Sequence, residues 1–443
     1  MQNDSAPNLG AQQQQIADQF FRPEWEDPIM VIQGEAGTGK STLLRKLVEE
    51  SRKRDLRVVV AAPTGLAALN VGGQTIHSLF RLRPALQLKS GKDDPYWPKT
   101  QAVFRLMANM DVLIIDEMSM VRVDLFEAID RTLRKNLRSS KPFAGKKVVL
   151  IGDLNQLEPV VTGSEHDPGS EHSFIHENWP SRFFFDSDIY QEVGKNFIHL
   201  TENYRQQSDK EFTQALRTLT DPETANPGYF NDLCLRDATP QAVNLTATRS
   251  GARNFNEAQM AKLSARAVTL WAKETCEGSF QWNDSNRPVP EVLTLNRGAR
   301  VVICSNGEEY VNGDTGTVIS VEDDCAEIEV ELDSGVTVSV EKHRWEYYAL
   351  EMDAETRTWG QKVVGTFIQF PLQPAWALTI HKCQGMTLPK AHVNLGRGAF
   401  SHGQTYVALS RVRTVGDLSL NRPLRMEDVI VDPRVSEYLR NPW

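Results

Sequence analysis

The segment at residues 34–41, Gly-Glu-Ala-Gly-Thr-Gly-Lys-Ser, constrains this chain more than any other feature. It matches the phosphate-binding pattern G-x-x-x-x-G-K-[ST] at every fixed position. Residues 29–32, just upstream of this segment, are all apolar, and a helical pattern begins at Ser41. Because the pattern needs a strand, a loop and a helix in that order, it predicts an α/β fold.

Each residue type in this loop has a physical role at a phosphate group. Glycines let backbone N–H groups approach phosphate oxygens, and the N-terminus of the following helix adds partial positive charge. We expect Lys40 to reach the β- and γ-phosphates of a nucleotide, and the Ser41 hydroxyl to ligate Mg²⁺. The predicted nucleotide contacts of the loop are Gly34, Glu35, Ala36, Gly37, Thr38, Gly39, Lys40, Ser41 and Thr42.

Apolar runs alternate with helical stretches through the first half of the chain. Buried strands are predicted at residues 57–62, 111–115 and 147–151, with a shorter one at 197–200. This alternation is typical of a parallel sheet with helices on both faces. Ligands of such sheets bind beyond the carboxyl ends of the strands, where the polar motifs of this chain fall.

The second half contains a second α/β unit that is interrupted. It begins at residues 242–248 and resumes at 376–380, and short β-like runs with turn signals such as Asn312-Gly313 lie between. We interpret the interruption as a small inserted β-barrel. The predicted division is a first domain at 1–180, a second domain at 181–292 and 371–443, and the insertion at 293–370.

Two carboxylates and one amide follow predicted strands of the first domain. Asp116 and Glu117 come directly after the apolar residues 112–115. Behind an upstream phosphate loop, this pair predicts the acidic half of an ATPase site, with Asp116 on Mg²⁺ and Glu117 as the base for the attacking water. Gln156, after the strand at 147–151, is a neutral amide suited to sensing the γ-phosphate.

Arg205 and Arg411 are predicted phosphate ligands. A guanidinium is always charged and binds phosphate in a bidentate way. An arginine that reaches the γ-phosphate from a second domain contributes ~10³–10⁵ in rate. A surface ion pair is the alternative for either residue, and the sequence around each favours the phosphate role.

Composition restricts the class of protein only loosely. The net charge is −9 and the pI is about 5.6, which argues against a protein that coats nucleic acid by bulk charge but leaves room for a local basic groove. The five cysteines are scattered, without C-x-x-C spacing, which favours a reduced intracellular protein without structural zinc. We see neither a signal peptide nor an apolar run long enough to span a bilayer.

The order of these motifs resembles superfamily 1 DNA helicases, and more narrowly the Pif (petite integration frequency) family in the group that includes RecD and Dda. The resemblance extends from about residue 13 to residue 413. It is carried by residues 62–68 (motif Ia), 73–78 (motif Ib), 124–146 (the Pif signature), 377–387 (motif V) and the segment around Arg411 (motif VI). Cys383 stands where the family more often has Ser, and Leu157-Glu158-Pro159 replaces Leu-Pro-Pro.

The resemblance implies two RecA-like P-loop NTPase domains with parallel sheets, and an SH3-like β-barrel inserted in the second. It implies an ATP- and Mg²⁺-dependent DNA helicase that moves 5′ to 3′ on single-stranded DNA and unwinds duplex, forked or structured DNA. Gly385 of motif V joins the predicted nucleotide contacts. An adenine-reading glutamine is implied near the N-terminus, where we favour Gln13 and leave Gln12, Gln14 and Gln15 open.

The predicted DNA contacts follow from motifs Ia, Ib and V. They are Thr64, His77, Thr379, His381 and Lys382. Hydroxyl, imidazole and ammonium groups are phosphate donors, but Thr64 is equally suited to capping a helix and His77 to a place in the core. Residues 79–100, with basic and aromatic side chains, lie where relatives carry a strand-separating loop, or they form a plain surface loop.

The expected partners are single-stranded DNA and single-strand–duplex junctions. We expect no membrane partner, and we expect the protein to be a monomer. The expected location is intracellular: cytoplasmic in bacteria or phage, or nuclear or mitochondrial in a eukaryote. Two alternatives stay open at this stage. One is a translocase on RNA or RNA–DNA hybrids, and the other is a nucleic-acid-stimulated ATPase switch subunit that does not unwind.

Overall fold

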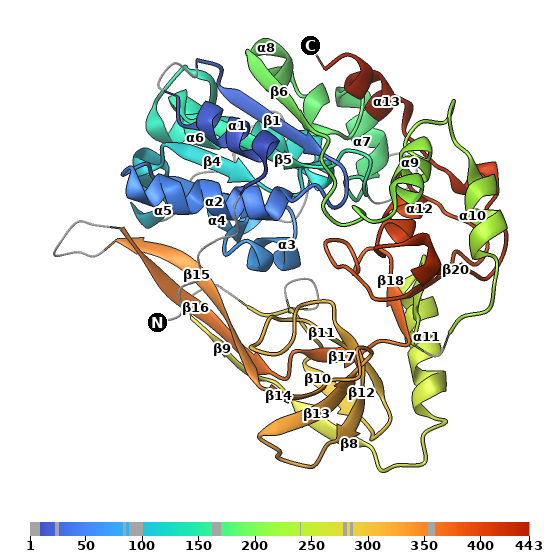
Figure 1. The fold of residues 1–443 in the computed structure, drawn as a ribbon. Coiled ribbons are helices and arrows are strands. Elements are labelled where there is room, and N and C mark those ends of the chain that lie inside the picture. Colours follow the sequence, from blue (N-terminus) through green and yellow to red (C-terminus); the bar gives the residue numbers. More distant parts are fainter. Residues whose placement is uncertain are drawn as a thin grey trace.

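The protein is described here by a computed structural model that covers residues 9–22, 26–82, 86–87, 101–161, 170–239, 241–277, 281–283, 287–352 and 359–442. Figure 1 shows two α/β bodies side by side and a β-rich body below them. No helix within these ranges is long and apolar enough to cross a membrane.

The first body is built on a parallel sheet of six strands in the order β3-β2-β4-β5-β1-β6. The strands are β1 (Ile29–Gly34), β2 (Val58–Ala62), β3 (Gln74–Thr75), β4 (Val112–Ile115), β5 (Lys147–Gly152) and β6 (Lys195–Leu200). The four strands predicted in this part of the sequence are confirmed, and the sheet carries the phosphate loop at the carboxyl end of β1, which lies between β5 and β6.

Helices cover both faces of this sheet. They are α1 (Ala11–Phe20), α2 (Lys40–Lys53), α3 (Gly65–Asn70), α4 (Ile76–Phe80), α5 (Gln101–Asn109), α6 (Val123–Leu137), α7 (Glu171–Asn178) and α8 (Asp188–Glu192), with short 3₁₀ turns η1 (Met118–Met120), η2 (Pro142–Gly145) and η3 (Phe184–Asp186). Alternate residues of β1 enter two cores, because successive strand side chains point to opposite faces. Met30 and Ile32 pack with α1 and α2, whereas Ile29 and Val31 pack on the side of α5 and α6.

The second body has a parallel sheet of four strands in the order β18-β7-β19-β20. Its strands are β7 (Val243–Thr246), β18 (Ala377–Thr379), β19 (Ala391–Asn394) and β20 (Leu418–Leu420). Its helices are α9 (Lys210–Thr218), α10 (Pro227–Cys234), α11 (Arg249–Met260) and α12 (Gln404–Leu409), with η4 (Val415–Asp417) and η5 (Met426–Asp428). The neighbours β7 and β18 are far apart in sequence, so the interruption predicted between them is confirmed.

The interrupting segment forms antiparallel sheets around its own core. A five-stranded sheet has the order β14-β13-β12-β11-β17, and smaller sheets pair β10 with β8 and place β16 between β15 and β9. The strands are β8 (Val268–Trp271), β9 (Lys273–Cys276), β10 (Val292–Leu295), β11 (Arg300–Ile303), β12 (Thr315–Ser320), β13 (Glu327–Leu332), β14 (Thr337–Glu341), β15 (His343–Met352), β16 (Trp359–Gln369) and β17 (Leu372–Pro374). An inserted β domain is therefore present, and its SH3-like character stays a prediction.

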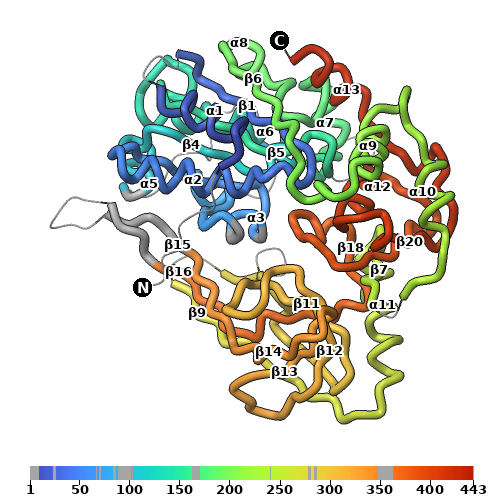
Figure 2. The backbone as a smooth tube through the Cα atoms, in the orientation of Figure 1, coloured from blue at the N-terminus to red at the C-terminus, as the bar shows by residue number. Residues whose placement is uncertain are grey.

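The structure differs from the predicted boundaries at three places. Strand β6 pairs with β1 along its length, so the first body extends past the boundary at 180. Strands β8 and β9 pair with β10 and β16, so the β-rich body begins before 293. The C-terminal helix α13 (Pro433–Arg440) returns to the first body (Figure 2), where Tyr438 stacks on Phe185 with ring centroids 4.2 Å apart. Such pairings join distant segments, which local patterns do not reveal.

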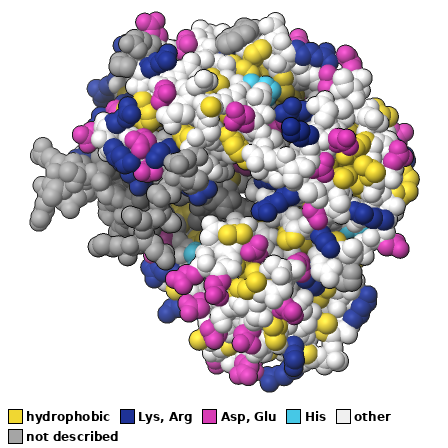
Figure 3. All heavy atoms as spheres, viewed as in Figure 1, with side chains coloured by type: hydrophobic (Ala, Val, Ile, Leu, Met, Phe, Trp, Pro, Cys, Tyr) yellow, Lys and Arg dark blue, Asp and Glu magenta, His cyan; other side chains and the backbone are white. Residues whose placement is uncertain are grey.

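The β-rich body touches the first α/β body through a long hairpin. Strands β15 and β16 extend beside α5 in Figure 1, and the Tyr347 hydroxyl lies 3.4 Å from the Thr75 hydroxyl. Strand β13 exposes Glu327, Glu329 and Glu331 on its solvent face. On the face drawn in Figure 3, acidic side chains gather on the left part of the β-rich body, and several Lys and Arg side chains lie along its junction with the α/β bodies. The net negative charge is therefore unevenly distributed.

Candidate nucleotide and nucleic-acid sites

The phosphate loop joins β1 to α2 in a conformation that requires glycine. Gly37 has φ of 90° and Gly39 has φ of 76°, both in the left-handed region. A Cβ on Gly37 would also lie 2.6 Å from the Cβ of Arg205. The loop therefore packs directly against the Arg205 segment, and Asn203 fixes this contact by donating from Nδ2 to the Ala36 carbonyl at 2.9 Å.

Lys40 is held against the loop by main-chain acceptors. Its Nζ donates to the carbonyl oxygens of Gly34 at 2.6 Å and Glu35 at 2.9 Å. Burial lowers the pKa of Lys40, and the nearby carboxylates of Asp153 and Glu117 oppose that shift. A half-buried ammonium that lines the cleft is suited to binding a polyphosphate anion.

The carboxylate pair lies at the carboxyl end of β4. Asp116 is buried, and burial followed by the charge of Glu117 raises its pKa to about 7. Glu117 has the left-handed φ of 52°, and its Oε2 accepts a hydrogen bond from Gln384 Nε2 of the second body at 3.0 Å. A divalent cation would favour the ionised form of Asp116.

The residues at this position fit a magnesium ion. Ser41 is exposed at the first turn of α2, and Asp116 is buried at the carboxyl end of β4. Among the described residues there is no group of three or more His, Cys, Asp or Glu that could hold a metal by itself. Mg²⁺ takes one or two protein oxygens and completes its shell with phosphate oxygens and water, and Ser41 and Asp116 offer a hydroxyl and a carboxylate of that kind.

Gln156 belongs to a buried network at the end of β5. Its Nε2 donates to Asp153 Oδ2 at 3.2 Å, while its Oε1 is buried without a hydrogen-bond partner in the described part of the chain. The Tyr406 hydroxyl of α12 donates to the same Oδ2 at 3.1 Å and accepts from the Ala36 N–H at 3.1 Å. The second body is thus bonded to both the phosphate loop and the Gln156 segment.

Arg205 and Arg411 lie together without a carboxylate partner among the described residues. Arg205 Nη1 donates to the Ser410 carbonyl at 3.1 Å. Arg411 is only 1% exposed and donates to the Val407 carbonyl at 2.8 Å and to Ser410 Oγ at 2.7 Å. Burial, then the charge of Arg411, lowers the pKa of Arg205 to about 9. Two largely buried guanidiniums without a counter-ion form a site for an anion.

These groups surround a cleft of about 840 Å³ between the two α/β bodies. The predicted residues that line it are Ala36, Gly37, Gly39, Lys40, Ser41, Thr42, Glu117, Gln156, Arg205, Gly385 and Arg411. Of the other loop residues, Thr38 bonds within the loop, and Glu35 forms an ion pair with Arg217 of α9 at 2.9 Å.

Of the four N-terminal glutamines left open, only Gln13 is seen to bond to the phosphate loop within the described part of the chain. It is buried, and its Nε2 donates to the carbonyls of Thr38 and Gly39 at 3.2 Å each. Gln12 instead bonds to β6, donating to the His199 carbonyl at 2.7 Å. Gln14 bonds to Asp18 on the exposed side of α1.

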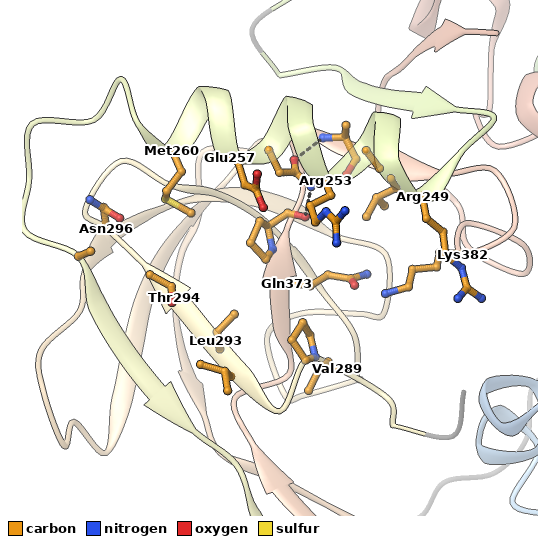
Figure 4. Close-up of a pocket in the computed structure, with 18 of the residues that line it drawn as sticks. Arg249, Arg253, Glu257, Met260, Val289, Leu293, Thr294, Asn296, Gln373 and Lys382 are labelled. Carbon is orange, nitrogen blue, oxygen red and sulfur yellow. Dashed lines mark hydrogen bonds between the residues drawn. The ribbon is translucent and has the colours of Figure 1, made fainter. Parts of the chain in front are cut away.

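A second and larger cavity, of about 1200 Å³, lies between α11 and the β-rich body. We call it the α11 groove (Figure 4). Arg249, Arg253 and Lys382 lie toward one end, and apolar side chains such as Val289 and Leu293 line the floor. This combination of cations with an apolar floor suits a strand that presents both phosphates and bases.

Comparisons with known proteins agree with this geometry. The pattern of the PIF1-like helicase family matches residues 8–222. The ATP-dependent DNA helicase PIF1 of Emericella nidulans is 31% identical over 92% of this chain and 60% of its own length. Crystal structures of Bacteroides Pif1 cover 98% of this chain and 97% of theirs. The complex with ADP-AlF4 has a TM-score of 0.85 at 28% identity, and the complex with ADP-AlF3 and single-stranded DNA has 0.66 at 30%.

The chain belongs to the PIF1-like helicase family. Its two α/β bodies are the RecA-like domains expected of that family. The chain spans about 60% of the length of the first curated relatives that it matches, so it corresponds to a part of those proteins.

The structure distributes the predicted DNA contacts of this PIF1-like chain over two regions. Thr379 and Lys382 line the α11 groove. Burial, and secondly the charge of nearby Arg249, lowers the pKa of His381. Thr64 Oγ1 accepts from the Ala67 N–H at 3.3 Å, which is the helix-capping alternative. His77 is half-buried on α4, where burial lowers its pKa. Most of the predicted strand-separating segment, residues 83–85 and 88–100, lies outside the described residues.

Four residues of these sites were missed by sequence reasoning. Arg249 and Arg253 had a usable signal, because two arginines four positions apart share one face of a helix. Tyr406 and Gln384 had none, because each acts through a partner in the other α/β body.

Proposed function

We propose that this protein hydrolyses ATP with Mg²⁺ and uses the cycle to translocate on single-stranded DNA and unwind duplex DNA. The observation that carries the proposal is the cleft, in which a phosphate loop on one domain faces two largely buried guanidiniums that have no carboxylate partner among the described residues. A bound triphosphate would accept hydrogen bonds from the phosphate loop on one side and from the two guanidiniums on the other, and it would join the domains.

The residues of the cleft have separate roles in this proposal. Lys40 and the loop N–H groups bind the phosphates, while Ser41 and Asp116 hold Mg²⁺, which supplies charge neutralisation when bound. Glu117 accepts a proton from the attacking water as the oxygen of that water bonds to the γ-phosphorus and ADP leaves. Gln156 senses the γ-phosphate.

Two further roles complete the nucleotide site. Arg205 and Arg411 stabilise the charge that develops on the transferred phosphoryl group, because both guanidiniums are fixed in place before the reaction. Gln13 reads the adenine, since its amide is positioned on the phosphate loop.

The α11 groove is the proposed path of single-stranded DNA. Its cations would bind phosphates and its apolar floor would contact bases. The relative with a nucleotide analogue and single-stranded DNA superposes less well on this chain than the relative with a nucleotide analogue alone, with TM-scores of 0.66 and 0.85. This supports a domain rearrangement that accompanies strand binding.

We further propose movement in the 5′ to 3′ direction and activity of a single protein molecule. A structure of relatives is described as DNA unwinding at forked duplex by two coordinating Pif1 helicases, so two molecules on one fork is the alternative outcome. Five unpaired cysteines support an intracellular location.

Unwinding of matched duplexes with a 5′ or a 3′ single-stranded tail tests the proposal. We expect ATP-dependent strand separation from the 5′-tailed duplex only. If one protein molecule is sufficient, the fraction of duplex unwound in a single turnover should not increase when protein is in excess over DNA. Lys40→Ala serves as the inactive control. Stimulation of ATPase activity by single strands without strand separation would instead identify a nucleotide switch, and unwinding from the 3′ tail would reverse the direction.

A further inference from the structure

The turn at residues 380–385 lies between the two sites. On one side, Thr379 and Lys382 line the α11 groove, and on the other, Gly385 and Thr387 line the nucleotide cleft. Because both cavities share this short segment, a displacement of the residues that line the groove would also shift the residues that line the nucleotide cleft.

The turn is braced from within its own domain. The Cys383 N–H donates to the Thr379 carbonyl at 3.1 Å, and the Cys383 side chain is fully buried. Arg411 Nη1 lies 3.4 Å from the Cys383 carbonyl and 3.3 Å from the Met386 carbonyl, on either side of Gln384. The turn therefore moves as a unit with Arg411 rather than as a flexible loop.

Gln384 extends from this braced turn to the predicted catalytic base. Its Nε2 donates to Glu117 Oε2 at 3.0 Å, across 267 positions of sequence and between the two RecA-like domains. A hydrogen bond to a carboxylate is stronger than one between neutral groups and fixes the carboxylate plane. With Oε2 engaged by Gln384, the second carboxylate oxygen of Glu117 is left for the proton of the attacking water.

We propose that Gln384 is a positioning residue that orients the Glu117 carboxylate and transmits strand binding in the α11 groove to ATP hydrolysis. The proposal rests on the proposed function. A strand phosphate bound by Lys382 would stabilise the turn, and the turn would hold Gln384 on Oε2. Hydrolysis would then be fastest when the groove is filled.

The test compares Gln384→Ala with wild type in the presence and absence of saturating single-stranded DNA. Loss of a hydrogen bond to a charged group costs roughly 1.5–3 kcal/mol, which corresponds to ~10–100-fold in rate. We expect this loss in kcat with DNA, a smaller loss without DNA, and changes under about twofold in KM for ATP and in DNA affinity. Gln214→Ala, an exposed glutamine on α9, is the matched control and should behave as wild type.

A double-variant cycle separates positioning from general damage to the fold. In a Glu117→Gln background, Gln384→Ala should cause no further loss of kcat, because Gln384 acts through that carboxylate. Full additivity of the two losses, or a kcat within twofold of wild type for Gln384→Ala, would overturn the proposal. Equal losses with and without DNA would overturn its DNA-coupling part. Absence of DNA stimulation in the wild-type protein would be a failure of the proposed function instead.

Discussion

The nucleotide cleft and the α11 groove are both proposed to bind phosphates, but their cations are held differently. In the cleft, Lys40 is fixed by two carbonyls and Arg411 is buried in a cage of main-chain and hydroxyl oxygens. In the groove, Arg249, Arg253 and Lys382 are exposed. Fixed charges can discriminate a transition state from a ground state, whereas exposed charges attract a backbone in any register. This difference in how the cations are held suits a site of ATP hydrolysis that lies beside a binding path for single-stranded DNA.

The largest expected effects follow from removing the fixed groups of the cleft. Lys40→Ala should abolish ATP hydrolysis, and Glu117→Gln should retain ATP binding while lowering kcat by ~10²–10⁴, the usual contribution of a general base. Steady-state ATPase assays and nucleotide-binding titrations check both variants. Affinity for single-stranded DNA measured without nucleotide should be nearly unchanged, because neither Lys40 nor Glu117 lines the α11 groove. Near-normal turnover in either variant would refute the assignment of the site.

Arg411 tests whether a buried guanidinium acts on the reaction or only on the fold. Arg411→Ala should lower kcat by ~10³ with a much smaller change in ATP affinity. It should also reduce the free energy of unfolding by roughly 1–3 kcal/mol, since it leaves the Cys383 and Met386 carbonyls without this donor. Arg411→Lys should restore little turnover, because an ammonium lacks the planar fork.

Turnover, nucleotide binding and thermal unfolding of both Arg411 variants decide the point. Full turnover with lysine, or destabilisation with kcat preserved, would make Arg411 a structural residue. Arg205, which lines the same cleft and donates to the Ser410 carbonyl, would then be the next arginine to test.

How far the sequence could predict each region follows from how each is built. The cleft is made of contiguous motifs, so Lys40, Asp116 and Arg411 could be assigned roles before the fold was known. The groove takes two of its cations, Arg249 and Arg253, from α11, which carries no motif, and only Thr379 and Lys382 of motif V were anticipated. The cross-domain bonds of Tyr406 and Gln384 join residues at sequence separations of 253 and 267 positions. Neither local propensity nor spacing encodes such pairs.

Neutralising the groove should weaken strand binding by a smaller, salt-dependent amount. Each of Arg249→Ala, Arg253→Ala and Lys382→Ala should reduce affinity for single-stranded DNA. Each should also make the negative slope of log K against log salt less steep, by about 0.7 for each phosphate that is no longer bound. Fluorescence anisotropy at several salt concentrations measures both quantities. Glu257→Gln, which removes an acidic side chain lining the same groove, is the matched control with the opposite expected sign. An unchanged slope in all three variants would remove the groove from the strand path.

The smallest expected effect concerns the hydroxyl that joins the two domains at the cleft. Tyr406→Phe keeps the buried ring but removes the bridge between the Ala36 N–H and Asp153 Oδ2. Burial raises the pKa of Tyr406, so the phenol stays protonated and remains a donor to that carboxylate. Leaving two buried groups without this partner should cost roughly 1–3 kcal/mol, or about 2–4 °C in Tm per kcal/mol for a domain of 150–250 residues.

Tyr204→Phe is the matched control, because its hydroxyl donates to Glu202 at the exposed rim of the cleft and its loss should leave Tm nearly unchanged. Equal Tm values for the two variants would mean that the Tyr406 hydroxyl does not stabilise the contact between the two domains. The contrast between the fixed cations of the cleft and the exposed cations of the α11 groove would then depend on the arginines alone.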